Sequence, residues 1–516
     1  MVITAKKSIV TGALILTAAG IITRLFGFVY RIYMSNLIGA EGMGLYQLIM
    51  PVYTLAWSIA CAGFNTTVSK LTAQEKAKGE TGNMGRVLKQ SVAITTTLGL
   101  VLTIGLFFGA KPLAAYFFND GRTQLPLQIL SLAFPFMAAG TCIRGYFIGL
   151  QETLVPAINQ VLEQIVRMAV VYALAAHFMT RGLTYACAVA VFAIVCEEIF
   201  SFFFTFVAYK RYKRKQGFTK PPVLTSSKVM HMIFVMAIPL TANRVVGSLL
   251  TTLENVLIPN RLQAFGMSSS EAISVFGRIS GMAMPLIYFP TAVLTSLSIT
   301  LVPAVSEAAA TEKLKHIGRT ASKSVLFAAV SGFGAACLFL TFPHELGTLI
   351  YHQPIGEMLL LLGAMCPFLY MQIIFSGILN GLGCQVFIFR NNIISSLIVI
   401  AIIYFLVPIY GPNAFIAGWF AALIVVCALE IEKIRKSVSL ETPFMNWLIK
   451  PVFAAFLASV SSRVAYRFAL DMTGPLWSLI LALAIMVLVY ISVVLLSGCI
   501  AREDMMRFSR KRESVA

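Results

Sequence analysis

The chain has 516 residues, of which 58% are apolar and only 12% carry a charged side chain. A mean hydropathy of +0.84 excludes a soluble globular protein of this size and indicates an all-α, polytopic membrane protein. The formal net charge of +19 does not indicate nucleic-acid binding, because the basic residues gather in short segments between apolar ones, as topology signals do.

Fourteen apolar segments follow one another along the chain, each close to or above the ~20 residues that a helix needs to cross a bilayer. We expect kinks in the segments that contain Pro135 and Pro367, because proline removes a backbone donor from a helix. The predicted transmembrane helices cover residues 8–35, 43–69, 87–110, 125–149, 154–178, 183–209, 229–257, 272–303, 321–342, 356–380, 386–407, 413–431, 446–470 and 475–499.

The distribution of basic residues predicts the orientation of these helices. Lys6 and Lys7 precede a first apolar segment that is longer than a signal-peptide core, so we expect a retained first span. If the N-terminus is cytoplasmic, the inner segments hold 28 basic residues and the outer loops hold 4. This asymmetry predicts that both termini lie in the cytoplasm. The densest cluster, residues 210–215 (KRYKRK), is interpreted as an orientation anchor that contacts anionic lipids.

Three motifs of the first half of the chain recur, in order, in the second half. Residues 23–27 (TRLFG) recur as 243–247 (NRVVG), 50–53 (MPVY) as 284–288 (MPLIY), and 145–150 (GYFIGL) as 377–382 (GILNGL). We therefore predict two six-helix lobes, residues 1–215 and 216–440, related by a pseudo-two-fold axis along the membrane normal. Residues 441–516 would add two helices and a basic cytoplasmic tail. The glycine pairs at GxxxG spacing favour close helix packing.

Arg24 is the first functional candidate, because a guanidinium at the centre of a bilayer costs roughly 2.5 to 3.5 kcal/mol unless it faces a partner, a wet cavity or an anionic ligand. The duplication makes Arg244 its equivalent, and two guanidinium groups match the oxygens of a phosphate dianion. Arg31 shares a helix face with Arg24, although it could instead extend to the outer interface. Arg144 and Arg278 are further candidates within apolar segments.

Four carboxylates within the predicted helices are candidates for a coupling-ion site or for structural ion pairs. Glu163 and Arg167 are four residues apart, which favours an ion pair on one helix face. Glu197 and Glu198 lie deep in the sixth helix, where a coupling-ion ligand and a partner of an arginine are both open interpretations. Glu254 lies near the outer end of its helix and could reach the interface. Polar groups that could bind backbone or sugar hydroxyls are Asn65, Asn243, Asn380, Asn391 and Asn392.

No motif indicates an enzyme, a cofactor or a metal site. The chain has no GxxxxGK[ST], GxGxxG or HExxH sequence, and its 9 cysteines lie in or beside apolar segments without paired spacing. Transport by such a protein would have to draw on a gradient, the membrane potential or the disequilibrium of the substrate itself.

Four segments resemble the stage V sporulation protein B family, which belongs to the multidrug/oligosaccharidyl-lipid/polysaccharide exporter superfamily. They are residues 23–28 (TRLFGF), 38–47 (IGAEGMGLYQ), 144–151 (RGYFIGLQ) and 156–167 (PAINQVLEQIVR). The resemblance implies two six-helix lobes around a central cavity that opens alternately to either side. It also implies transport of an undecaprenyl-linked saccharide across the bacterial cytoplasmic membrane, and a role in spore-cortex peptidoglycan synthesis.

By the same resemblance, Arg24 corresponds to a cavity arginine that engages the pyrophosphate in lipid II flippases, and the last two helices would form a groove for the lipid tail. Those flippases carry further arginines on the second helix, where this chain has residues 54–57 (TLAW). We therefore hypothesise a flippase of a polyprenyl-diphosphate-linked saccharide, such as lipid II. Its predicted substrate-binding residues are Arg24, Arg244, Arg31, Arg144, Arg167 and Arg278.

Two other functions remain open from the sequence. The first is a cation-coupled drug exporter of the same superfamily, whose cavity would hold carboxylates and aromatic side chains. The second is a non-transporting membrane scaffold that recruits cell-wall synthesis enzymes through its cytoplasmic loops. The expected partners of the flippase are the lipid-linked saccharide, anionic membrane lipids and cell-wall enzymes, with no nucleic acid, no cofactor and no metal.

Overall fold

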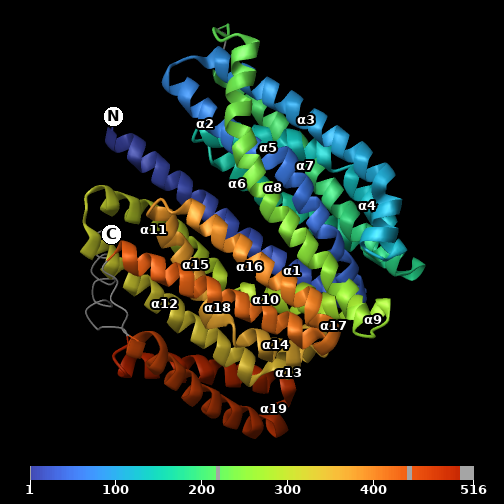
Figure 1. The fold of residues 1–516 in the computed structure, drawn as a ribbon, viewed down its shortest axis with the longest axis vertical. Coiled ribbons are helices and arrows are strands. Elements are labelled where there is room, and N and C mark those ends of the chain that lie inside the picture. The colour runs from blue at the N-terminus through green and yellow to red at the C-terminus, as the bar shows by residue number, and fades with distance from the viewer. Residues whose placement is uncertain (1, 217–220, 439–443, 500–516) are drawn as a thin grey trace. The chain divides into compact units, whose positions relative to one another are not determined.

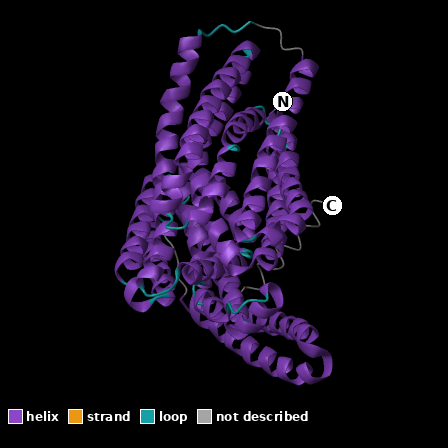
Figure 2. Cartoon of the chain, turned by 90° about the vertical axis from the view of Figure 1, so that its right-hand side faces the viewer, coloured by secondary structure: helices purple, strands orange, loops and turns teal. Residues whose placement is uncertain are grey.

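The computed structural model describes residues 2–216, 221–438 and 444–499. Within these ranges every regular element is a helix and none is a strand, which confirms the all-α class (Figure 2). The basic tail that the sequence predicts after residue 500 lies outside the described residues. The chain folds into two compact units: unit 1 contains residues 1–281 and 403–411, and unit 2 contains residues 282–402 and 412–516.

Unit 1 is built from the helices of the first half of the chain and one helix that the sequence assigns to the second lobe. Helix α8 packs in unit 1 against α1, α2 and α3. The lobe boundaries at residues 215 and 440 stay a prediction. The helices of unit 1 (Figure 1) are α1 (Val2–Trp57), α2 (Gly63–Ala77), α3 (Thr81–Pro112), α4 (Gln124–Ser131), α5 (Phe134–Gly149), α6 (Leu154–Phe178), α7 (Leu183–Gln216), α8 (Ser226–Ala264), α9 (Ser269–Phe276) and α17 (Val407–Tyr410).

Unit 2 pairs α12 with α15 and α19, and α15 with α11 and α18. An ion pair between Arg463 of α19 and Glu345 of α13 joins the last long helix to this unit. The helices of unit 2 are α10 (Met284–Tyr288), α11 (Thr291–Ala310), α12 (Leu314–Thr341), α13 (Pro343–Leu346), α14 (Gly356–Gly363), α15 (Cys366–Gly381), α16 (Gln385–Phe405), α18 (Pro412–Ser437) and α19 (Lys450–Leu496). The last residues of α16, 403–405, belong to unit 1.

Ten helices among the described residues are long and apolar enough to cross a membrane, and the number rises to twelve if two bent helix pairs are each one span. The bends measure 45° between α4 and α5 and 48° between α14 and α15. Pro135 and Pro367 lie in the first turn after each bend, where a missing N–H costs little. The two predicted kinks are therefore confirmed.

Helices α1 and α19 each contain a glycine at which the backbone leaves the helical conformation. Gly39 has φ 68° and ψ −174°, and Gly474 has φ 76° and ψ 170°. An uninterrupted helix of 56 residues would extend over ~84 Å, far beyond the ~30 Å of a hydrocarbon core. Each glycine therefore divides a long helix into two segments, at the places where the sequence predicts loops.

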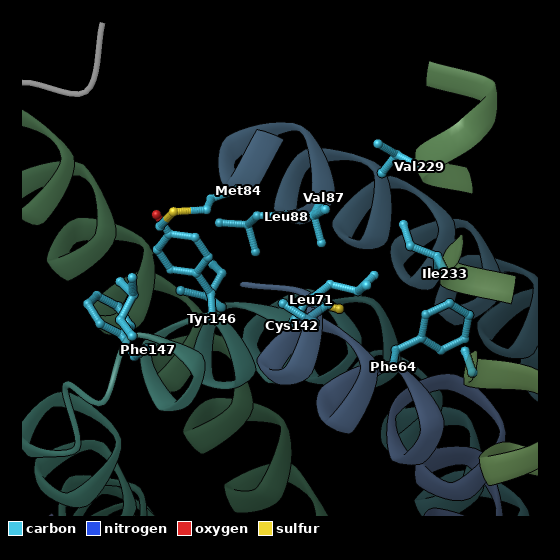
Figure 3. Packing of buried hydrophobic residues seen from close by; sticks show 14 residues of the cluster. Phe64, Leu71, Met84, Val87, Leu88, Cys142, Tyr146, Phe147, Val229 and Ile233 are labelled. Carbon is cyan, nitrogen blue, oxygen red and sulfur yellow. The ribbon is translucent and has the colours of Figure 1, made fainter. Parts of the chain in front are cut away.

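Four helices of unit 1 meet in a continuous apolar core. Figure 3 shows their side chains packed together; the cluster contains Phe64, Val68 and Leu71 of α2, Met84, Val87 and Leu88 of α3, Cys142, Ile143, Tyr146, Phe147 and Leu150 at α5, and Val229, Ile233 and Ala237 of α8. Helix α5 reaches this position because it carries glycine where it meets α2. A Cβ atom added at Gly145 would lie 2.6 Å from the Asn65 carbonyl oxygen, and Gly381 of unit 2 is similarly close to Val305. The packing interpretation of the GxxxG pairs is confirmed.

Candidate functional site

A network of buried polar side chains lies in unit 1 where α5, α6 and α7 meet. The Arg144 Nη1 donates to Glu163 Oε1 at 2.5 Å and to the Ser201 hydroxyl at 2.7 Å, and its Nη2 donates to Thr141 at 2.8 Å. The Asn159 amide donates to the same Glu163 oxygen at 2.7 Å and to Ser201 at 2.9 Å. The charge of Arg144 is thereby balanced by a carboxylate on the neighbouring helix.

A second ion pair joins Arg167 of α6 to Glu197 of α7. The Nε and Nη2 of Arg167 donate to the two Glu197 oxygens, a bidentate geometry that suits a guanidinium. The neighbouring Glu198 accepts a hydrogen bond of 2.5 Å from the Tyr53 hydroxyl, and its Oε2 is buried without a hydrogen-bond partner. Glu197 is therefore the partner of an arginine, whereas Glu198 forms no ion pair with any described residue.

The predicted ion pair between Glu163 and Arg167 is wrong, because each side chain pairs with a different helix. Glu163 binds Arg144 of α5 and Arg167 binds Glu197 of α7. A pair four residues apart contributes only about 0.2 to 0.5 kcal/mol to an isolated helix. Buried partners on adjacent helices give stronger, less screened interactions, so tertiary packing decides the pairing.

Arg24 and Arg244 lie outside this network, on the exposed sides of α1 and α8. Apolar neighbours on both helices are also exposed, such as Leu25 at 47% and Val246 at 40%. Neither arginine has a hydrogen bond or ion pair to any described residue. Among the described residues, no carboxylate is paired with either guanidinium group.

The remaining predicted residues are dispersed. Arg31 and Glu254 are half-buried on α1 and α8. Arg278 lines a cavity of about 450 Å³ beside α9, together with Glu271, and its Nε is buried without a partner. Hydrogen bonds from the backbone and hydroxyl of Ser268 lower the pKa of Glu271 below its usual value, so this carboxylate is charged at neutral pH. Of the ten predicted site residues, five meet in the network of α5, α6 and α7.

Unit 2 contains a buried carboxylate that the sequence analysis did not single out. Glu430 of α18 is fully buried, and its Oε1 accepts a hydrogen bond of 3.0 Å from Ser376 of α15. Asn391 of α16 is also fully buried, and neither atom of its amide has a partner. In the sequence, Glu430 is followed closely by Lys433, Arg435 and Lys436, so it has the position of a charge at the membrane interface.

Among the described residues, no group of three or more His, Cys, Asp or Glu side chains could hold a metal ion.

The architecture and its buried ion pairs define a multi-pass membrane protein with the fold of a known flippase. The solved structure titled "Lipid II flippase MurJ, inward closed conformation" is similar with a TM-score of 0.71 and 14% identity, over 96% of this chain and 100% of that one. At this level of identity the likeness concerns the fold alone.

The sequence comparisons identify the family. The model described as "Polysaccharide biosynthesis protein" matches residues 9–309. Stage V sporulation protein B of Bacillus subtilis (strain 168) is 30% identical over 433 residues, covering 83% of this chain and 82% of the relative. Lipid II flippase MurJ of the same organism is 26% identical over 373 residues, covering 68% and 65%. The chain belongs to the polysaccharide biosynthesis protein family and, within it, to that of stage V sporulation protein B, as the sequence motifs indicate.

Proposed function

We propose that this protein is a flippase that moves a polyprenyl-diphosphate-linked saccharide, such as the peptidoglycan precursor lipid II, across the bacterial cytoplasmic membrane by alternating access. Membership of the family and the similarity to lipid II flippase MurJ support a flippase or transporter rather than an enzyme. The similarity to stage V sporulation protein B supports a role in sporulation. The saccharide headgroup is too polar to cross hydrocarbon unaided, which is the physical need for such a protein.

The observation that supports this proposal most strongly is the exposure of Arg24 and Arg244 without a bonding partner among the described residues. Both guanidinium groups are exposed and have no hydrogen bond or ion pair to any described residue. Guanidinium groups bind phosphate oxygens well, and more strongly away from bulk water. We assign the diphosphate to these two residues, with Arg31 and Arg278 as secondary contacts. Arg144 and Arg167 stay predicted contacts, although their charges are already balanced by Glu163 and Glu197.

The proposed topology has fourteen spans with both termini in the cytoplasm. The twelve candidate spans include α1 and α19, and the breaks at Gly39 and Gly474 divide each of these into two. The proposal keeps the two six-helix lobes with their pseudo-two-fold axis and the two additional helices of α19. Outward movement of a dianion through an inside-negative potential of 100 mV would be favoured by roughly 4.6 kcal/mol, twice the value for one charge.

We further propose anionic lipids of the cytoplasmic leaflet as partners of the basic cluster at residues 210–215. Arg211 and Lys215 lie at a groove of about 570 Å³ with the apolar side chains of Phe200, Phe203 and Phe204. This combination suits an acyl chain with an anionic headgroup. Replacing Arg211 and Lys215 with glutamine should reduce retention of phosphatidylglycerol in the purified protein. Replacing Lys213 and Arg214, which do not line the groove, should change it less; equal losses would contradict the groove.

The test of the cargo class is a comparison of lipids in vesicles that contain the purified protein. We expect protein-dependent movement of lipid II and of other saccharides linked through a polyprenyl diphosphate. The same saccharide on a neutral lipid, without the diphosphate, should not move. Movement of the neutral lipid at an equal rate, or transport of small drug-like cations only, would contradict the proposal and favour an exporter.

A further inference from the structure

Several helices of unit 2 repeat helices of unit 1 with a nearly constant sequence offset. Helices α5 and α15 begin and end 232 residues apart (366 − 134 and 381 − 149), and the same offset relates both ends of α4 and α14. The offset also relates Asn159 of α6 to Asn391 of α16, both fully buried. Helices α7 and α18 begin 229 residues apart (412 − 183). Positions in the two units can therefore be matched one by one.

Each unit has a hydrogen bond between the same two matched positions, but the residue types at those positions differ between the units. In unit 1, Arg144 of α5 donates to Ser201 of α7 at 2.7 Å. In unit 2, the matched residues are Ser376 of α15 and Glu430 of α18, and Ser376 donates to the carboxylate at 3.0 Å. A serine thus occupies the position of the arginine, and a carboxylate occupies the position of the serine.

The consequence is a difference in charge between the two networks. In unit 1, Arg144 is paired with Glu163. The matched position of Glu163 in unit 2 is Ser395, and that of Arg167 is Val399. Glu430 is therefore left as a carboxylate without the arginine that the first network contains.

Among the described residues, no basic side chain forms an ion pair or hydrogen bond with Glu430. The side chain is 0% exposed, and its Oε2 is buried without a hydrogen-bond partner. Two basic side chains of α16 and α18, Arg390 and Lys433, lie over the ring of Phe387, at 5.0 Å and 5.9 Å from its centroid. On the same helix, the Cys427 thiol donates to a backbone carbonyl of α15 at 3.4 Å. An isolated buried carboxylate is so costly that such groups become neutral instead.

A polar connection leads from Glu430 to a cavity inside unit 2. The Gln372 amide donates to the Ser376 hydroxyl at 3.1 Å, and Ser376 donates to Glu430. Gln372, Asn392 and Ser395 lie among the lining residues of a cavity of about 200 Å³. This polar cavity has room for water, because one water molecule needs roughly 10 to 15 Å³ of cavity volume.

We propose that Glu430 is an exchangeable proton site, at which a bound proton takes the charge-balancing place that Arg144 holds in unit 1. A hydronium ion in the cavity transfers one proton to the carboxylate, giving a neutral carboxylic acid and water, and the reverse step returns the proton to water. The acid has one O–H to donate. Asn391 offers an acceptor for it, because its amide oxygen is buried without a partner and the matched Asn159 donates to Ser201, the residue matched to Glu430, at 2.9 Å.

The proton site stands independently of the transported substrate, whereas its use to drive transport rests on the proposed flippase function. We propose that proton binding and release at Glu430 couple a proton gradient to the movement of the lipid. Two experiments separate these claims, one on the purified protein alone and one on transport.

The first experiment measures the infrared band of protonated carboxylic acids in the purified protein in lipid nanodiscs, over a range of pH. We expect one band component at neutral pH in the wild type that is absent in Glu430→Gln and is separate from any contribution of Glu198, which is also buried. Glu432→Gln, which removes an exposed carboxylate paired with Lys436, is the matched control and should keep the band. Ser376→Arg places a fixed cation beside the carboxylate and should also remove the band. An identical spectrum for the wild type and Glu430→Gln at every pH would overturn the site.

The second experiment measures lipid movement in vesicles under an imposed pH gradient, with and without sodium. Transport driven by the pH gradient should fall at least tenfold in Glu430→Gln and stay unchanged in Glu432→Gln. A rate that depends on sodium and not on pH would overturn the proton assignment. If the infrared band is confirmed but no lipid moves in the wild type, the proton site holds and the flippase function fails.

Discussion

Arg167 and Glu197 form a pair whose separation should be costly, because the carboxylate side chain is only 4% exposed. Arg167→Met leaves this carboxylate buried without its partner, and we expect it to lower the free energy of unfolding by about 3 to 5 kcal/mol. Replacing both residues with methionine should recover most of that loss, since no unpaired charge remains. Thermal unfolding of the purified variants measures the difference. Equal losses in the single and double variants would show that the pair itself is not the cause.

Replacing Arg24 or Arg244 should change the free energy of unfolding far less than Arg167→Met does. Both are exposed and have no hydrogen bond or ion pair to any described residue, so alanine at either position removes little from the folded state. We expect changes in unfolding free energy within about 0.5 kcal/mol. A loss as large as that of Arg167→Met would mean that these arginines serve the structure rather than a ligand.

The sequence identified the charges of the network of α5, α6 and α7 but not their partners. A charged residue in an apolar segment is visible in the sequence, which is why Arg144, Arg167, Glu163 and Glu197 were predicted. Their pairing depends on which faces of α5, α6 and α7 meet, and short-range spacing favoured the wrong pair. Glu430 was missed because basic residues follow it closely in the sequence, whereas its burial depends on how α15 packs against α18.

At the scale of helices, the break at Gly39 sets the geometry of α1. Its φ of 68° and ψ of −174° fall in a region that is essentially restricted to glycine. We expect Gly39→Ala to cost about 1 to 3 kcal/mol of stability. Gly20→Ala is the matched control, because Gly20 is helical in the same element and no atom lies within 4 Å of an added Cβ. It should be neutral or stabilising; an equal loss in both variants would contradict a specific role for the break.

The close approach of α5 to α2 gives a second prediction for the helices. Gly145→Ala would bring a Cβ within 2.6 Å of a backbone oxygen of α2, and we expect a loss of about 1 to 3 kcal/mol from overpacking. Gly105→Ala on α3, where nothing lies within 4 Å, should not destabilise the protein. Thermal unfolding in detergent measures both variants. A stable Gly145→Ala protein would show that the two helices can separate without cost.

At the scale of the whole molecule, the sequence predicted the helical class, the kinks and the breaks, whereas the lobe boundaries stay a prediction. Apolar length and proline or glycine position are local properties, so the bends at Pro135 and Pro367 and the breaks at Gly39 and Gly474 were visible in advance. The packing of α8 with the helices of unit 1 depends on side chains far apart in the sequence. No local pattern reports such contacts.

The proposed function rests on Arg24 and Arg244, which have no ion pair to any described residue, and one measurement tests them directly. Vesicles with fluorescent lipid II and purified protein report how much of the headgroup becomes accessible on the other side. We predict protein-dependent movement for the wild type and for Arg319→Ala, an exposed control on α12, and loss of movement in Arg24→Ala and Arg244→Ala with folding intact. Full movement in well-folded Arg24→Ala and Arg244→Ala proteins would contradict the proposed diphosphate site.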